Sequence, residues 1–232
     1  MLLYKFKSAQ DALYALDIAI HERIFCAPYA SLNDPFEGQF RTLIGDPSLG
    51  FPSLFTHGFG QQNSRVAYSG LDTIALEGPS RVCSLSADWR DVRMWALYAD
   101  SFRGLAFEFD VNPDEPELHQ VVYGAELPKL NVGLLMPSDT IDALTHKTEH
   151  WSYETEWRYI SERQYIDLPG RLRKIYLGSR VAPAVRDAVL KVAPSHTKVH
   201  LVGLDPVNVR MTLGPELPRA SEAATGISDL LP

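Results

Sequence analysis

One short segment, residues 153–159, constrains this chain more than any other. Its sequence is Tyr-Glu-Thr-Glu-Trp-Arg-Tyr, in which charged and mostly aromatic side chains alternate. Because side chains of a β-strand point alternately to the two faces of a sheet, the segment predicts a strand. Glu154, Glu156 and Arg158 would share one face, and the aromatic face would be buried. Gathering three charges beside a buried face is costly, so we expect chemistry here.

The composition is that of an ordinary globular protein. The chain has 232 residues, of which 45% are apolar and 22% are charged, and this is enough for a substantial core. The formal net charge is −7, without the basic stripe of a non-specific nucleic-acid binder. No apolar run approaches the ~20 residues of a membrane span, and no signal-peptide pattern is visible. We therefore expect a cytoplasmic protein that binds neither membranes nor nucleic acid non-specifically.

The two cysteines, Cys26 and Cys83, each lie in a short apolar run. We expect both to be buried, reduced thiols in strands. Two residues are too few for a disulfide framework or a four-cysteine zinc site.

The apolar periodicity predicts short strands mixed with helices. Helices are expected after Ser8, at 91–100, at 138–148 and after Pro183, and strands at 2–6, 23–27, 81–86, 104–110, 118–123, 154–161, 173–177, 198–202 and 207–213. In the first helix, Leu13, Leu16 and Ile20 are expected to face the core. The strand at 104–110 alternates strictly, which predicts one buried face and a hairpin with 118–123.

Together these elements predict an α+β fold with a single domain, in which a mixed, mostly antiparallel sheet is flanked by helices. We expect this domain to span residues 1–213. Residues 214–232 are rich in Pro, Ser and Ala and are expected to form a C-terminal tail. Residues 45–79, rich in Gly, Pro and Ser, are expected to be loop with short helical pieces.

The segment Asn33-Asp34-Pro35-Phe36-Glu37 carries several groups suited to ligand binding. Asx side chains and proline favour a turn, so a purely structural role is one interpretation. The functional interpretation is a loop that presents Asn33, Asp34 and Glu37 to a ligand, with Phe36 anchored in the core.

The helical segment Met94-Trp95-Ala96-Leu97-Tyr98 has the spacing of core residues. In the functional interpretation, Trp95 and Tyr98 form the wall of a pocket for a nicotinamide or adenine ring.

Residues 146–150 match the H-x-x-E-H pattern of inverted zinc peptidases, with His146 and His150 one helical turn apart. The predicted helix ends at about this point, and no third ligand is evident. A chance match is therefore the favoured interpretation, and no metal is expected.

Several motifs, taken in order, resemble the bacterial family called domain of unknown function 2971. They are Leu3-Tyr4-Lys5-Phe6, Asn33 to Glu37, Cys83-Ser84-Leu85-Ser86, Met94 to Ala99 running into Gly104, and Trp151 with Glu154 to Arg158. The likeness covers roughly residues 2–180. The family name implies a bacterial domain but states no activity.

The order of elements also resembles that of the ADP-ribosyltransferases, whose split, mostly antiparallel sheet binds NAD. The likeness rests on the strand–helix–strand at 2–27 and on the Glu-x-Glu of 154–156. It implies that Glu156 holds the nicotinamide ribose and stabilises an oxocarbenium-like transition state, while Glu154 orients the acceptor. Lys5 stands where this family has His or Arg, and no Ser-Thr-Ser motif is present.

Three functions stay open on the sequence. The first is an NAD-using transferase or glycohydrolase, in which Arg158 grips a phosphate. The second is a binding or regulatory module of a stress or phage-defence system. The third is a hydrolase with magnesium or manganese held by Asp34, Glu37, Glu154 and Glu156.

Overall fold

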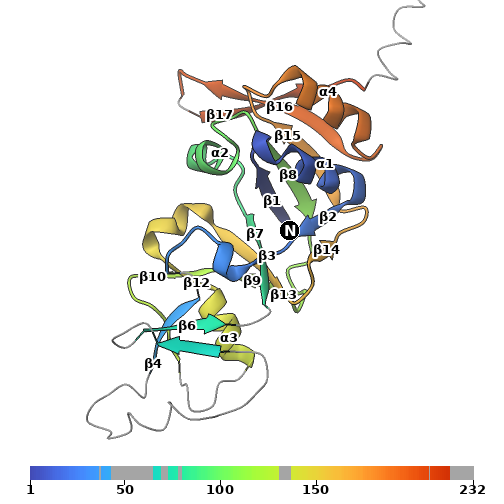
Figure 1. Cartoon of the computed structure of the whole chain (residues 1–232). Coiled ribbons are helices and arrows are strands. Elements are labelled where there is room, and N and C mark those ends of the chain that lie inside the picture. Colours follow the sequence, from blue (N-terminus) through green and yellow to red (C-terminus); the bar gives the residue numbers. More distant parts are fainter. Residues whose placement is uncertain are drawn as a thin grey trace, which may run out of the picture.

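The computed structural model describes residues 1–36, 38–42, 65–68, 73–77, 80–130, 137–208 and 210–219. Its centre is a nine-stranded mixed sheet (Figure 1). The strands run, in spatial order, β17 (Arg210–Glu216), β16 (Lys198–Asp205), β15 (Leu172–Leu177), β8 (Leu105–Asp110), β1 (Leu2–Lys7), β7 (Arg81–Ser86), β13 (Glu156–Ser161) and β9 (Leu118–Gln120), with β3 (Ala27–Pro28) also on β7. Only β15 and β16 pair in parallel within this sheet.

Helices and smaller pairings surround this sheet. The helices are α1 (Ala12–His21), α2 (Val92–Tyr98), α3 (Pro137–Leu144) and α4 (Pro183–Val192), with 3₁₀ turns η1 (Ala9–Asp11), η2 (Tyr29–Ser31) and η5 (Glu149–Glu154). The smaller pairings are β10 (Val122–Gly124) with β12 (His146–Thr148), β14 (Tyr165–Asp167) with β2 (Arg23–Phe25), and the sheet β11 (Lys129–Leu130), β4 (Gln39–Thr42), β6 (Thr73–Glu77), β5 (Arg65–Tyr68). The predicted α+β, single-domain arrangement with a mostly antiparallel sheet is confirmed.

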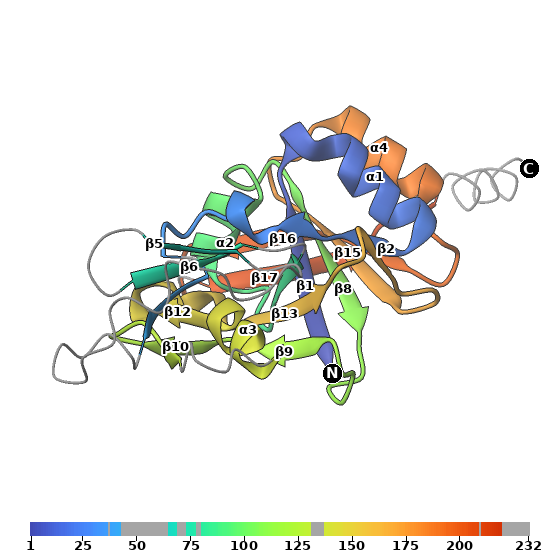
Figure 2. The same ribbon diagram turned by 60° about the horizontal axis from the view of Figure 1, so that its bottom comes forward.

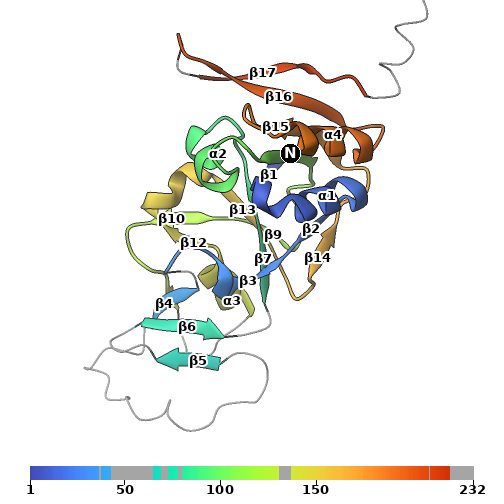
Figure 3. The same cartoon turned by 45° about the horizontal axis from the view of Figure 1, so that its top comes forward.

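The four-stranded sheet lies at the opposite end of the molecule from β17 (Figures 1 and 3). Two of its strands, β5 and β6, fall inside the region that the sequence assigned to loop. No helix in the described part of the chain is long and apolar enough to cross a membrane.

One face of the large sheet is covered by α1 and α4, which lie side by side (Figure 2). The core beneath them combines apolar side chains of both helices with those of the sheet, among them Leu3, Ile18, Phe107, Ile175 and Val189. Burial of each such side chain stabilises the fold by about 1.5–3 kcal/mol.

The opposite face packs against α2. Its core contains Phe6, Ala106 and Tyr176 from the sheet, together with Met94 and Trp95 from the helix. Because α2 covers this face, β8 is buried on both sides, and the prediction of a half-buried strand was wrong. The strand at 118–120 also pairs with β13 rather than with β8, since β8 is already flanked by β1 and β15.

The apolar stripe predicted for α1 was wrong. Leu13 is 82% exposed and Ile20 is 52% exposed, whereas Ala15, Ile18 and Ala19 are buried. Only Leu16 of the predicted stripe packs against the core. The two alanines are spaced one helical turn apart and belong, with Ile18, to the core beneath the helix.

The predicted tail begins too early. Residues 214–216 belong to β17. The guanidinium of Arg219 then donates hydrogen bonds to the carbonyls of Ala193, Pro194 and Thr197, which fixes this segment to the end of α4. Residues 220–232 lie outside the described residues.

The packing of α1 makes a matched prediction for two isoleucines of one helix. Ile18→Ala is expected to lower the free energy of unfolding by about 2–5 kcal/mol, because it leaves a cavity beneath the helix. Ile20→Ala is expected to change it by less than about 0.5 kcal/mol, since that side chain faces solvent. Urea denaturation of both variants measures the difference. Equal losses would contradict the observed orientation of α1.

Candidate functional site

A pocket of about 170 Å³ lies where β1, β7, β13 and α2 meet. Its apolar wall is formed by Phe6, Leu32, Met94 and Tyr98. Its charged floor is formed by Lys147, Glu154, Glu156 and Arg158, and Lys5 also lines the pocket.

The pairing of the strands explains why a pocket opens here. β1 pairs with β8 along its whole length but meets β7 only at Tyr4 and Ser86. Beyond that pair, the Lys5 ammonium reaches across and donates to the Ser84 carbonyl at 2.8 Å. A side chain thus replaces the missing ladder hydrogen bonds, and both strands contribute to the wall.

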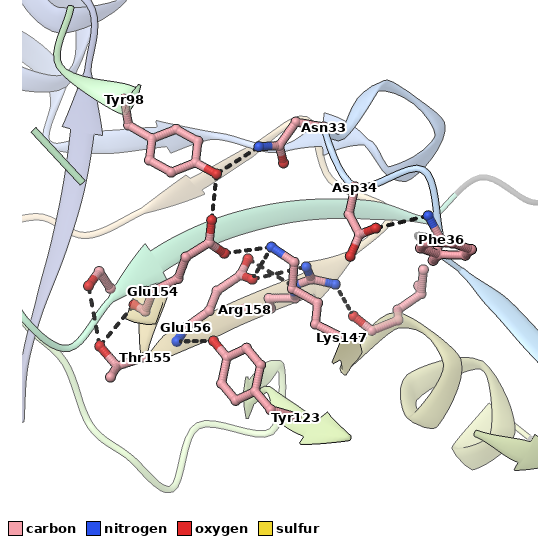
Figure 4. Close-up of polar contacts among 12 residues, drawn as sticks. Asn33, Asp34, Phe36, Tyr98, Tyr123, Lys147, Glu154, Thr155, Glu156 and Arg158 are labelled. Atoms are coloured by element: carbon pink, nitrogen blue, oxygen red, sulfur yellow. Dashed lines mark hydrogen bonds and ion pairs between the residues drawn. The ribbon is translucent and has the colours of Figure 1, made fainter. Parts of the chain in front are cut away.

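A continuous chain of polar contacts runs across the pocket (Figure 4). The Asn33 amide donates to the Tyr98 hydroxyl at 2.7 Å, and that hydroxyl donates to Glu154 Oε1 at 2.5 Å. Lys147 Nζ donates to Glu154 Oε2 at 2.5 Å and lies 3.2 Å from Glu156 Oε2. The Asn33 loop and the two glutamates therefore meet in one site, as the functional interpretation of the sequence required.

Arg158 completes this network. Its Nε and Nη2 donate to the two oxygens of Glu156 at 2.9 Å and 3.0 Å, a bidentate pair. A third nitrogen, Nη1, donates to the carbonyl of Leu144 at the end of α3. The guanidinium is thus committed to the protein, and the predicted grip on a ligand phosphate is not visible in this arrangement.

The two glutamates converge by a route that the sequence did not indicate. The predicted strand begins only at Glu156, and Glu154 is the last residue of η5. Thr155 joins them with φ of 43°, in the left-handed region that a β-branched residue rarely adopts. Its carbonyl accepts from Ala87 at 3.0 Å, and its hydroxyl lies 3.4 Å from that of Ser86. Strain of this kind is typical of functional sites.

The Asn33 loop has the reverse of the expected orientation. Asp34 is only 3% exposed, while Phe36, expected in the core, is 50% exposed. Asp34 Oδ1 accepts from the Phe36 amide at 2.9 Å, which is the predicted Asx turn. Asp34 Oδ2 is buried without a hydrogen-bond partner and points toward the Arg158 side of the network (Figure 4). Glu37 lies outside the described residues.

Trp95 does not line the pocket. It is fully buried, donates its indole N–H to the Trp89 carbonyl at 2.6 Å and stacks on Phe102. The core interpretation is therefore correct for Trp95, whereas Tyr98 lines the pocket, and the nicotinamide or adenine ring expected there stays a prediction. Both lie on α2, and only Tyr98 is on the side that faces Glu154.

Sequence reasoning missed Lys147 and Tyr123 as site residues. In the sequence, Lys147 is notable only as a residue between His146 and His150. Its short strand has no apolar alternation that would predict burial. The hydroxyl of Tyr123 accepts a hydrogen bond from the backbone N–H of Glu156 at 2.8 Å. It thereby holds the first residue of β13 in place.

The zinc-peptidase pattern does not form. His146 lies in β12 and His150 in η5, so the two rings do not share a helix face. Among the described residues, no three His, Cys, Asp or Glu side chains gather at one point. Between Glu154 and Glu156, the position that a cation would take is filled by the Lys147 ammonium.

The buried charges shift each other's pKa in opposite directions. Burial raises the pKa of Glu156, but Arg158 and Lys147 outweigh it and lower the value to about 2. For Glu154, burial outweighs the hydrogen bonds from Lys147 and Tyr98, so its pKa lies above the ordinary value. Glu156 is therefore a permanent carboxylate, and Glu154 is the one that takes up a proton more readily.

The two carboxylates also differ in the capacity that they offer a ligand. A carboxylate has about four acceptor positions. Those of Glu156 are largely taken by two donors of Arg158 and by the Lys147 ammonium. Glu154 accepts from Tyr98 and Lys147 alone within the described part of the chain, and this leaves about two positions.

The comparisons with known proteins give no relative. No family model matches the chain, and no curated protein and no solved structure is detectably similar to it. The two family resemblances inferred from the motifs therefore stay predictions.

The lowered pKa of Glu156 predicts that the free energy of unfolding falls in acid. Its contribution is present above the ordinary pKa of 4.5 and is lost as the pH falls toward 2. The size is on the order of 3 kcal/mol, from 1.36 kcal/mol for each pKa unit.

Unfolding in guanidinium chloride at several pH values between 7 and 3 measures this loss of stability. Glu156→Gln is expected to be less stable at pH 7, because it leaves Arg158 without its buried carboxylate. The variant is also expected to lose less stability than the parent on acidification. A variant that loses as much stability as the parent on acidification would show that another group is responsible.

Proposed function

We propose that this chain is an NAD-using enzyme that cleaves the bond between nicotinamide and ribose and passes the ribosyl group to water or to an acceptor. The observation that carries this proposal is the pocket itself. Two buried carboxylates form its floor beneath an apolar wall with one tyrosine. An apolar wall suits a nicotinamide ring, and a carboxylate suits both a ribose hydroxyl and the positive charge that develops on the sugar.

The acceptor capacity of the glutamates assigns their roles differently from the family likeness. Glu154 retains free acceptor positions on the pocket floor, so it is the better candidate to contact the ribose. Glu156 is largely occupied by Arg158 and Lys147, and its role is to hold the Lys147 ammonium in place. Glu154 is then the catalytic residue, and Glu156 is a positioning residue.

The size of the pocket limits which part of NAD it takes. Its volume of about 170 Å³ is smaller than the ~300–1,000 Å³ typical of sites that enclose a drug-sized ligand. The nicotinamide and its ribose would lie inside, and the adenylate portion would extend outside. The exposed Asn33, which lines the pocket, would contact the bound portion. A cytoplasmic location belongs to this proposal, because NAD is an intracellular cofactor.

A second function has its own support. Lys147, Glu154, Glu156 and Arg158 are all buried and satisfy one another's charges. Such a closed network suits a rigid binding module without catalysis, as in a stress or phage-defence system. Lys147 and Arg158 also oppose positive charge on a bound sugar, and this weakens the help that either carboxylate gives to bond cleavage.

One experiment separates the two functions. The purified protein is incubated with NAD, and released nicotinamide is measured by chromatography, while NAD affinity is measured by calorimetry. If the chain is the proposed enzyme, nicotinamide accumulates in proportion to protein. Glu154→Gln is expected to lower the rate by about 10²–10³, the usual effect of removing one group that stabilises charge in the transition state.

The matched control is Glu162→Gln, the same chemical change at an exposed position just after β13. It is expected to release nicotinamide at the parent rate. Binding of NAD without release would favour the binding module. Neither binding nor release, with the parent fully folded by circular dichroism, would rule out NAD as the ligand.

A further inference from the structure

The register of β3 on β7, extended by one residue, brings the two cysteines opposite each other. β3 pairs with β7 in antiparallel register, with Ala27 opposite Val82 and Pro28 opposite Arg81. One further step along both strands places Cys26 opposite Cys83. Both residues are free thiols and fully buried.

This placement satisfies the distance that a disulfide requires. Opposite residues of an antiparallel pair have Cα atoms about 4.5–5.5 Å apart. Disulfide-bonded cysteines have Cα atoms about 4.4–6.8 Å apart. Each thiol also shifts the pKa of the other, as expected of two neighbouring sulfur atoms.

The surroundings favour the reactive form of one thiol. Burial raises the pKa of Cys83, but the neighbouring Cys26 thiol and the nearby ammonium groups of Lys5 and Lys7 lower it to about 7. The neighbouring Cys83 thiol and burial raise the pKa of Cys26. The pair thus consists of one thiol that ionises near neutral pH and one that keeps its proton, as in a nucleophilic and a resolving cysteine.

We propose that Cys26 and Cys83 are a redox modification site, which a hydroperoxide converts into a cross-strand disulfide. The Cys83 thiolate attacks one peroxide oxygen, the O–O bond breaks, and hydroxide leaves with the proton that Cys83 had lost, as water. Cys26 sulfur then attacks the Cys83 sulfenic acid, the S–O bond breaks, and the second water carries away the Cys26 proton. Two thiols and one hydrogen peroxide give one disulfide and two waters.

The oxidant gains access by local opening. β3 has two residues and β2 three, and Cys26 lies between them. Short strands with few ladder hydrogen bonds open at low free energy compared with the centre of a sheet. A small peroxide is therefore expected to react, and a bulky disulfide such as oxidised glutathione to react more slowly.

The disulfide would act on the candidate site through two adjoining segments. On one side, β3 leads through η2 directly to Asn33 and Asp34. On the other, Cys83 precedes Ser84, which lines the pocket and accepts the Lys5 hydrogen bond. Oxidation would tie the base of the Asn33 loop to the strand that forms the pocket wall, and reduction would release it.

The test uses the full-length chain and hydrogen peroxide, followed by acid quenching and alkylation of remaining thiols. The treated protein is expected to lose two hydrogen atoms by intact mass and to take up no alkylating agent. Peptide mapping without reductant is expected to show a Cys26–Cys83 cross-link, and dithiothreitol is expected to reverse it. Hydrogen exchange in residues 27–36 is expected to slow in the oxidised form.

Two controls keep the result interpretable. Cys26→Ala is expected to keep one alkylatable thiol or to form only a Cys83 sulfenic or sulfinic acid. Cys83→Ser serves the same purpose if the first variant does not fold. Retention of two alkylatable thiols in the peroxide-treated parent would overturn the modification site. A cross-link that leaves exchange in residues 27–36 unchanged would overturn its effect on the loop.

Discussion

The site depends on one ammonium group, that of Lys147, placed between two buried carboxylates. Glu154 and Glu156 come from a 3₁₀ turn and a strand that meet at Thr155, and Lys147 comes from β12. Two carboxylates this deeply buried would repel each other strongly without a cation between them. The ammonium joins β12, η5 and β13 into one unit, and Tyr98 and Arg158 extend that unit to α2 and α3.

The main strands and helices could be predicted from the sequence, because the periodicity of apolar residues indicates them. Alternation over 104–110 and over 156–161 located two central strands, and Ser8 capped its turn as expected, by accepting the Gln10 amide. The face that each element buries could not be predicted in the same way. Ala15 and Ala19 look neutral in a hydrophobic pattern, and only the packing of the folded chain shows that they are core residues and that Leu13 is exposed.

The candidate site was predicted in part and for a partly mistaken reason. Alternation placed Glu154 beside Glu156, but a left-handed Thr155 is what brings them together. Proximity of Asn33 to Glu154 could not come from local patterns, because Tyr98 mediates it from a distant helix. Lys147 carried no signal at all, since a buried lysine is recognisable only once its carboxylate partners are placed.

The left-handed Thr155 has a consequence for how the protein acquires its site. Contacts with Ser86, the last residue of β7, and with Ala87, which follows it, hold Thr155 in its unfavourable conformation. A nascent chain or an isolated peptide containing residues 149–161 lacks those contacts and would relax to an ordinary extended form. The arrangement of the two glutamates therefore depends on the pairing of β7 with β13, and neither strand can hold it alone.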